Sequence, residues 1–351
     1  MIHWLLFFFA LSAVFFFYHM MKKSLIKTLF FAIGWIGLFV FSAFRYDVGW
    51  DYSMYYALAG GKNYDAVGFL NYHYDRMGLV TQWILDLADS MHCPTVFFVI
   101  TTFIILTCLT YACFKLSMWP EMSLMLCFAL PHFYLDSFST VRQWCAIALS
   151  SAALALFINE KKRPAAVLNA VAVFFHSSAL LLFLIWFIPA KKLKRSYYIW
   201  LIVVCAVLKE FFLNFLLLGG GRFASYVSGK IGDGGTKIVL LYLIIFVLMW
   251  LFQKRLADFT KKDILLFNIA FVGVMLAVIL NGYGHVAFRI PIYFFIAVIF
   301  LIPKYFGLIR FKSLSFMVLT AVCALLLIVS LAISNTPAKN PYIPYRNLFL
   351  E

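Results

Sequence analysis

The residues best suited to chemistry in this sequence are a few arginines, aspartates and histidines that lie between long apolar runs. Arg45 begins the stretch RYDVGWDY at 45–52, and a helix starting at Asp51 would place Asp51 and Tyr55 on one face. This combination could form an anion-binding arginine beside a carboxylate base. The alternative is a belt of interfacial aromatic residues around an arginine that extends its charged end to the membrane surface.

A second arginine, Arg142, follows the polar stretch DSFST at 136–140. Serine and threonine at these positions could cap a helix that begins near residue 140, and a helix N-terminus attracts anions. An arginine in the first turn opposes the helix dipole, which indicates an anion nearby. The alternative is a salt bridge between Arg142 and Asp136.

His176 lies in an apolar run, within FFHSS at 174–178. A histidine in this setting could act as a base, a proton shuttle or a hydrogen-bond donor. The alternative is a hydrogen-bonded core histidine with no chemical role.

A further group contains His285, Arg289 and Tyr293, which are spaced four residues apart and could line one helix face. Pro291 predicts a kink or a helix start within this segment. The alternative is an arginine at the membrane edge beside an interfacial tyrosine.

Three arginines, Arg45, Arg142 and Arg289, are therefore expected on one side of a mostly uncharged body. The arginine fork binds phosphate in two places and stays charged, so a lipid pyrophosphate is the natural ligand. Fixed cations would stabilise its departure as an anion. Tyrosines and tryptophans within 46–83 could stack against sugars. No carboxylates show metal-ligand spacing, so neither a metal nor another cofactor is expected.

The composition indicates that these residues are positioned by membrane-spanning helices. Of the 351 residues, 65% are hydrophobic and only 12% are charged, whereas soluble domains carry about 25% charged residues. The net charge of +15 comes from short basic clusters between apolar runs. This is the pattern of cytoplasmic loops and argues against nucleic-acid binding. The seven cysteines form no CxxC pair and are interpreted as structural thiols.

A span needs about 20 apolar residues. The sequence predicts a single membrane domain over 1–351, an all-α bundle of ten to twelve spans that includes the first run as a retained span. Ten of these spans can be placed near 2–19, 25–44, 94–114, 119–136, 140–158, 196–217, 237–252, 263–281, 286–303 and 313–333.

Segment 164–189 has the length of one crossing, but one crossing would separate two basic clusters, 161–163 and 191–195. Two short helices that meet near His176 would keep both clusters cytoplasmic. Such a broken segment needs protein or a water-filled cavity around it. In this topology every candidate residue lies on the outer side, and the longest outer loop, 45–93, is expected to be partly helical.

Several runs of the sequence, taken in order, resemble one family. The run FSAFRYDVGWDYSMYY resembles the signature of the EpsG family, which is similar to Wzy-type O-antigen polymerases. The runs STVRQWCAIAL, VAVFFHSSALLLFLIWFI and FRIPIYFF, and the tail YIPYRNLF, agree with the family in the same order. The resemblance covers nearly the whole chain.

The resemblance implies a bacterial inner-membrane glycosyltransferase with a fold similar to GT-C enzymes. Such a polymerase transfers a growing glycan from undecaprenyl pyrophosphate to a second lipid-linked repeat unit at the periplasmic face, without a metal. A flippase and a chain-length regulator are the partners it implies. The family's marked residues fall on Arg45, Gly49, Asp51, Tyr52, Tyr55, Arg142, His176 and Arg289. The resemblance also leads us to expect a glutamate near 74–77, where this chain has only Asp75.

The leading hypothesis is a lipid-linked oligosaccharide polymerase in which Asp51 or His176 deprotonates or orients the acceptor hydroxyl. The substrate and its pyrophosphate would be bound by Arg45, Arg142, Arg289, Tyr52, Tyr55 and His285. Three alternatives are a flippase or other transporter, a ligase that shares the lipid donor, and a membrane acyltransferase. A transporter predicts internal repeats, which the sequence lacks, and an acyltransferase predicts an acid beside the histidine.

Overall fold

The computed structural model describes residues 1–22, 24–61, 67–211, 214, 235–256, 258–283, 286–334 and 341–349. Within these ranges the chain is helical, and its only β-type pairing is an isolated bridge between Arg45 and Asn347. The chain forms two compact units, one of residues 1–180 and 309–351 and the other of residues 181–308. The predicted all-α fold is confirmed.

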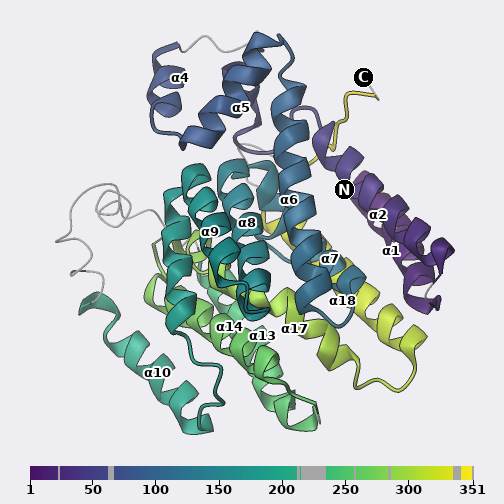
Figure 1. The fold of residues 1–351 in the computed structure, drawn as a ribbon, viewed down its shortest axis with the longest axis vertical. Coiled ribbons are helices and arrows are strands. Elements are labelled where there is room, and N and C mark those ends of the chain that lie inside the picture. Colours follow the sequence, from purple (N-terminus) through teal and green to yellow (C-terminus); the bar gives the residue numbers. More distant parts are fainter. Residues whose placement is uncertain are drawn as a thin grey trace. The chain divides into compact units, whose positions relative to one another are not determined.

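The first unit contains most of the helices (Figure 1). Their bounds are α1 Ile2–Met20, α2 Leu25–Ala43, α3 Tyr52–Leu58, α4 Val67–Tyr74, α5 Leu79–Ser90, α6 Thr95–Leu116, α7 Pro120–Ala129, the 3-10 helix η1 Tyr134–Phe138, α8 Val141–Ile158, α9 Lys162–Phe175 and α18 Lys312–Ile333. α8 packs against α6 and α9, while α1 packs against α2, α7 and α18. The predicted outer loop 45–93 is partly helical, as expected, because it contains α3, α4 and α5.

The second unit is built around α14, Lys261–Ile279, which packs against its neighbours α10, α13, α16 and α17. The other helices of this unit are α10 Arg195–Val207, α13 Thr236–Phe252, η3 Gln253–Arg255, α15 Val286–Arg289, α16 Ile292–Phe295 and α17 Ala297–Phe306. The glycine-rich stretch 218–234 lies outside the described residues.

The helices identify a multi-pass membrane protein. In the described part of the chain, seven helices are long and apolar enough to cross a membrane: α1, α2, α6, α8, α13 with η3, α14 and α18. A broken pair, Val286–Phe295 and Ala297–Phe306, meets at 58° and would make an eighth span. Many large apolar side chains are exposed on these helices, as a lipid-facing surface requires.

Among the ten placed spans, 286–303 is the broken pair described above, and 119–136 differs from the structure. The segment 119–136 forms only the ten-residue α7 before it turns into η1. Pro131 explains this end, because the residue before a proline avoids the helical region, and Leu130 is extended at ψ 135°. The segment 196–217 begins with α10, Arg195–Val207, but positions 212–213 and 215–217 lie outside the described residues, so this placement stays a prediction.

The helix break predicted near His176 is confirmed. α9 ends at Phe175, and His176 is extended, with φ −153° and ψ 121°. A 3-10 helix, η2, then covers Ser177–Phe187. The return of the chain to its starting side, the assignment of sides, the single membrane domain and the likeness to GT-C enzymes stay predictions.

Candidate active site

Arg45 follows directly after α2 and is almost fully buried, at 2% exposure. Its Nη1 donates a hydrogen bond to the carbonyl oxygen of Ser42 at 2.5 Å. Its guanidinium carbon lies 4.7 and 4.5 Å from the ring centres of Phe98 and Phe138. Burial lowers the pKa of Arg45 to about 10, so the group stays charged at neutral pH. The arginine is therefore enclosed by protein and does not extend to the membrane surface.

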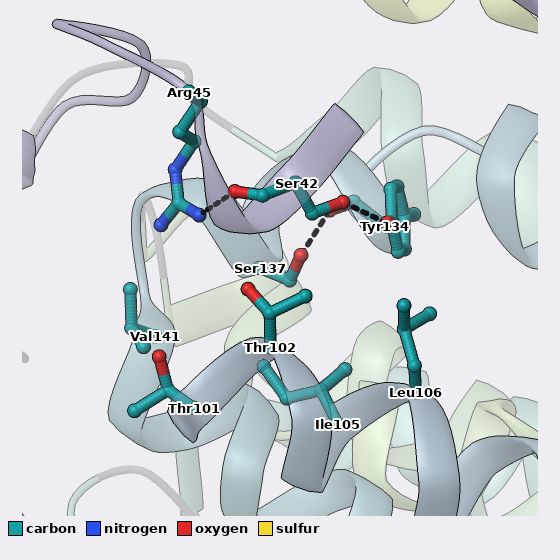
Figure 2. Close-up of a pocket in the computed structure, with 9 residues that line it drawn as sticks. All are labelled: Ser42, Arg45, Thr101, Thr102, Ile105, Leu106, Tyr134, Ser137 and Val141. Carbon is teal, nitrogen blue, oxygen red and sulfur yellow. Dashed lines mark hydrogen bonds between the residues drawn. The ribbon is translucent and has the colours of Figure 1, made fainter. Parts of the chain in front are cut away.

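A narrow pocket lies beside Arg45 and is shown in Figure 2. Its lining residues are Ser42, Arg45, Thr101, Thr102, Ile105, Leu106, Tyr134, Ser137 and Val141. Hydroxyl groups dominate its polar part, and Ser42 Oγ is bonded to the phenol of Tyr134. The space is too small for a water molecule in this arrangement. A ligand could reach Arg45 only after the pocket opens.

The segment 341–349 holds the chain around Arg45 in place. The amide of Tyr46 donates to Arg346 O at 3.0 Å, and the amide of Leu348 donates to Phe44 O at 2.9 Å. The ring of Tyr345 stacks on Phe41 in α2, with ring centres 4.0 Å apart. These bonds connect the end of the chain to the segment that carries the family-marked residues.

Gly49 sits where the 44–50 segment meets the end of η1. Its φ of +115° favours glycine, and a Cβ atom there would lie 2.3 Å from the carbonyl oxygen of Phe138. The amide of the next residue, Trp50, donates to Ser139 Oγ at 2.9 Å. A side chain at position 49 would therefore separate the two backbone segments.

Arg142, Tyr55 and Asp51 form the second polar group of this unit. Arg142 is half-buried, and its Nε donates to the hydroxyl of Tyr55 at 3.0 Å. Burial raises the pKa of Tyr55, while the charge of Arg142 opposes that rise and the charge of Asp51 adds to it. Asp51 precedes α3, so the predicted helix start is confirmed. Asp51 and Arg142 thus both act electrostatically on one phenol.

The contacts of residues 136–142 differ from two expectations: a side-chain cap on the helix that begins near residue 140, and a salt bridge between Arg142 and Asp136. Thr140 is the N-cap of α8, but its hydroxyl donates to Asp136 O at 3.0 Å and makes no cap bond. Asp136 bonds to His132 Nδ1 at 3.0 Å, whereas Arg142 donates to Tyr55. The predicted side-chain cap is wrong because a turn of η1 places Asp136 O within reach of the hydroxyl. The first turn of α8 therefore begins without a side-chain cap.

His132 is a residue that the sequence analysis missed. It adopts a left-handed backbone conformation, with φ 61°, which is uncommon outside glycine. Its bond to Asp136 is the arrangement by which a carboxylate orients an imidazole. Both residues lie within the predicted span 119–136, and their spacing of four residues is the sequence signal that could have found the pair.

Tyr52 packs in the core beside Arg45. Its ring stacks on Phe98, with centres 4.7 Å apart and planes 6° apart. Arg45 lies over the same phenylalanine ring. Burial raises the pKa of Tyr52, and the charge of Arg45 opposes that rise. Tyr52 is 4% exposed, so in this arrangement it packs in the core and offers no face to a sugar.

His176 lies at the same end of the α8–α9 pair as Arg142. The two helices are joined by a turn at 159–161 and linked by a bond from Ser150 Oγ to Asn169 Oδ1 at 3.0 Å. Seven residues, about two turns, lead from Ser150 back to Gln143 and from Asn169 forward to His176. The antiparallel register therefore places His176 level with Gln143, next to Arg142 along the chain.

The end of α9 also meets the residue that precedes α5. A Cβ atom on Gly78, which precedes α5, would lie 2.0 Å from Phe174 O and 2.8 Å from Phe175 O. The segment expected to carry the family glutamate therefore ends close to His176. His176 Nδ1 bonds to Ser178 Oγ at 2.6 Å, within its own turn.

Arg289 and Tyr293 belong to the second unit. Arg289 is the last residue of α15 and is half-buried, while Tyr293 is buried in α16. Ile290 and Pro291 separate these helices, so the predicted break at Pro291 is confirmed and the four-residue spacing does not follow one regular helix. His285 lies outside the described residues. The meeting of three arginines in one site stays a prediction, because Arg289 and Arg142 are in different units.

A comparison with family models identifies the chain. The model of the EpsG family matches residues 28–347, nearly the whole length. The chain belongs to the EpsG family. Searches of curated proteins and of solved structures give no significant match. The resemblance inferred from the ordered sequence runs is thereby confirmed.

Membership of the EpsG family points to a polysaccharide-polymerase type of function. The matched range contains Arg45, Asp51, Tyr55, Arg142 and His176, which the structure places in one unit. Among the described residues, no three of His, Cys, Asp and Glu come together as a metal site requires.

Proposed function

We propose that this EpsG-family protein is a glycosyltransferase that polymerises lipid-linked oligosaccharides. A hydroxyl of one undecaprenyl-pyrophosphate-linked repeat unit attacks the anomeric carbon of a second glycan. The bond from that carbon to the pyrophosphate breaks, and the lipid pyrophosphate leaves as an anion. The reaction is proposed for the periplasmic face of the bacterial inner membrane. The observation that carries this proposal is the family match over residues 28–347.

Arg142 is the residue best placed to bind the leaving pyrophosphate. It is half-buried, and its Nε is held in place by the hydroxyl of Tyr55. It lies in the first turn of α8, whose amides carry no side-chain cap and whose dipole favours an anion. Helix and arginine then act on the same charge, and the stabilisation grows as the bond breaks.

The acceptor hydroxyl needs a group that takes its proton. Two residues are proposed for this role, Asp51 through its position beside Tyr55 and His176 through its position level with the start of α8. A histidine base must be neutral and an aspartate base must be ionised, and histidine side chains as a type titrate at higher pH than aspartates, so activity should fall at a higher pH if the base is a histidine. A pH–rate profile therefore separates the two assignments.

Arg45 and Arg289 are proposed as the other pyrophosphate ligands, each with a structural condition. Arg45 binds the pyrophosphate directly only if its closed pocket opens. Otherwise it contributes a fixed positive charge that acts on Tyr52. Arg289 acts only if the second unit brings α15 to the start of α8.

The test uses Arg142→Ala and Arg142→Lys in a polymerase-deficient host, with the surface polysaccharide separated on a gel. We expect Arg142→Ala to lower polymerisation about 100-fold, the usual cost of removing one such donor. Lysine should restore little, because it lacks the bidentate fork. The matched control is Arg310→Ala, an exposed arginine just before α18, which should give a wild-type ladder.

An in vitro assay with a single lipid-linked repeat unit separates the alternatives. A polymerase converts the unit into dimers and longer products, whereas a ligase needs a different acceptor and a flippase makes no bond. A wild-type ladder from Arg142→Ala, or an absence of dimers from wild-type protein, would contradict the proposal.

A further inference from the structure

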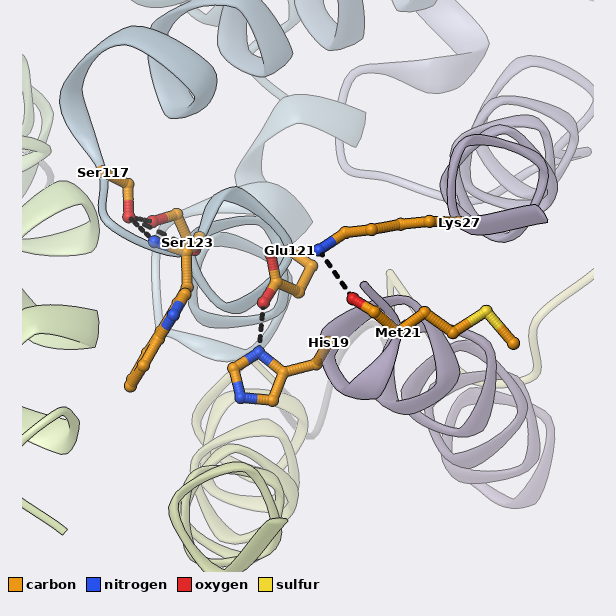
Figure 3. A network of polar contacts seen from close by, with 7 residues as sticks. His19, Met21, Lys27, Ser117, Glu121 and Ser123 are labelled. Carbon is orange, nitrogen blue, oxygen red and sulfur yellow. Dashed lines mark hydrogen bonds and ion pairs between the residues drawn. The ribbon is translucent and has the colours of Figure 1, made fainter. Parts of the chain in front are cut away.

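A second polar site lies in the first unit at the opposite ends of α1 and α2 from Arg45. His19, in the last turn of α1, faces Glu121, in the first turn of α7, and His19 Nδ1 lies 2.7 Å from Glu121 Oε1 (Figure 3). The side chains of both residues are 2% exposed. A buried carboxylate is costly unless it is fully paired, so the other contacts of this pair matter.

Each member of the pair has a buried atom without a hydrogen-bond partner among the described residues. These atoms are Glu121 Oε2 and His19 Nε2. When neutral His19 donates through Nδ1 to Glu121, its Nε2 becomes an acceptor. Two buried acceptors then lack a donor. A group with several N–H donors and a positive charge would satisfy both, and a primary ammonium has that chemistry.

A pocket of about 320 Å³ opens beside the pair. This is near the lower end of small-molecule pockets, roughly 300–1,000 Å³. Its lining residues are Tyr18, His19, Met20, Met21, Lys22, Lys27, Met118, Trp119, Pro120, Glu121 and Lys312. Glu121 is the only acid among them, and three lysines accompany it.

The lysines lie nearer to solvent than the acid does. Lys22 and Lys312 are exposed and Lys27 is half-buried, whereas Glu121 is 1% exposed. Lys27 is held by a bond from its Nζ to Met21 O at 3.3 Å and lies over the ring of Tyr18. A ligand that enters the pocket therefore meets positive charge first and the carboxylate deeper inside. This order fits a phosphate with an ammonium group beyond it.

We propose that this pocket binds the head group of an aminophospholipid, with its primary ammonium at Glu121 and His19 and its phosphate at the lysines. A lipid is favoured over a soluble phosphoamine because Lys27 and Lys312 lie in the first turns of α2 and α18. Both helices are candidate spans, so their ends lie where lipid head groups gather. The site is separate from the proposed polymerase site and does not depend on it.

The test is native mass spectrometry of the full-length protein purified with three lipids of equal chain length. Phosphatidylethanolamine has N–H donors, phosphatidylcholine has the same charges without N–H donors, and phosphatidylglycerol has only the phosphate. We expect wild-type protein to retain phosphatidylethanolamine about fivefold or more over each of the others. Equal retention of the three lipids would overturn the proposal.

Variants then locate the site. Glu121→Gln keeps the shape of the side chain but removes its charge, and should abolish the preference for phosphatidylethanolamine over phosphatidylcholine. Lys312→Gln should lower the retention of all three lipids. The control is Lys254→Gln, an exposed lysine outside the pocket, which should behave as wild type.

Two further outcomes decide the assignment. An unchanged preference in monodisperse Glu121→Gln protein would contradict the site. Tight binding of soluble phosphoethanolamine to protein that retains no phospholipid would overturn the choice of a lipid. If Glu121→Gln does not fold, the comparison of lipids on wild-type protein still decides.

Discussion

The first unit buries a charge at each end of its helices, and the two environments differ. Arg45 is enclosed by the rings of Phe98 and Phe138 and donates to a backbone carbonyl, beside a pocket that excludes water. Glu121 is bonded to His19 beside a pocket of about 320 Å³ and keeps one oxygen without a partner. One charge is enclosed by the fold, and the other faces a space that a ligand could fill.

The difference follows from the chemistry of the two groups. A guanidinium is weakly hydrated and is stabilised by aromatic faces, so an apolar core rich in phenylalanine can hold it. A carboxylate gains nothing from the faces of aromatic rings and needs N–H or O–H donors. We therefore expect the fold to tolerate the loss of Arg45 much better than the loss of the partner of Glu121.

The largest effect should come from His19→Leu, which leaves Glu121 buried without its partner. Removal of one member of a buried pair costs about 3–5 kcal/mol, so the protein should lose its monodisperse state at a much lower temperature. The double variant His19→Leu/Glu121→Leu should recover most of the loss. If the single and double variants were equally unstable, the pair would not act as a unit and the comparison would fail.

The next effect should come from Gly49→Ala. The new Cβ would meet Phe138 O at 2.3 Å at a φ of +115°, so we expect a loss of about 2–4 kcal/mol. Heating followed by size exclusion measures it. Gly37→Ala in α2 is the matched control, because its Cβ would lie 3.8 Å from the nearest atom, on Phe7. Equal stability of the two variants would show that the contact of Gly49 with η1 is dispensable.

The smallest effect on stability should come from Arg45→Met. Burial disfavours the charged form and lowers the pKa of Arg45 to about 10, so an apolar side chain of similar length should change stability by only about 1 kcal/mol in either direction. Polymer formation, by contrast, should be lost. Folded, fully active Arg45→Met protein would exclude the proposed role of Arg45. An unfolded variant would contradict the expectation that the fold tolerates the loss of Arg45 better than the loss of the partner of Glu121.

Local patterns in the sequence predicted most of the helices. Apolar runs placed α1, α2, α6, α8 and α14 correctly, and the basic clusters on either side of 164–189 predicted the break at His176. The run 119–136 was misread because its hydropathy outweighed Pro131, whose effect on Leu130 ends α7. When a helix end is predicted, a proline inside an apolar run should therefore outweigh the mean hydropathy of that run.

The sequence predicts which residues belong to the candidate site better than it predicts which residues they contact. The start of α3 after Asp51 followed from local spacing, but the bond of Arg142 to Tyr55 joins residues 87 positions apart. Arg45 was expected to face an anion or the membrane surface. Its burial depends on pairing with the distant segment 341–349, which no local pattern reveals. The His19–Glu121 pair escaped notice for the same reason, since 102 positions separate its members.

The pairing of residues 44–49 with residues 341–349 has a consequence for biogenesis. At a synthesis rate of about 5–20 residues per second, the later of the two paired segments reaches the membrane tens of seconds after the earlier one. Until then the backbone around Arg45 lacks the hydrogen bonds to Arg346 and Leu348 that hold it in the complete fold. A nascent or prematurely terminated chain would thus insert its helices before the segment around Arg45 is fixed, which would leave the candidate site of such a chain incomplete.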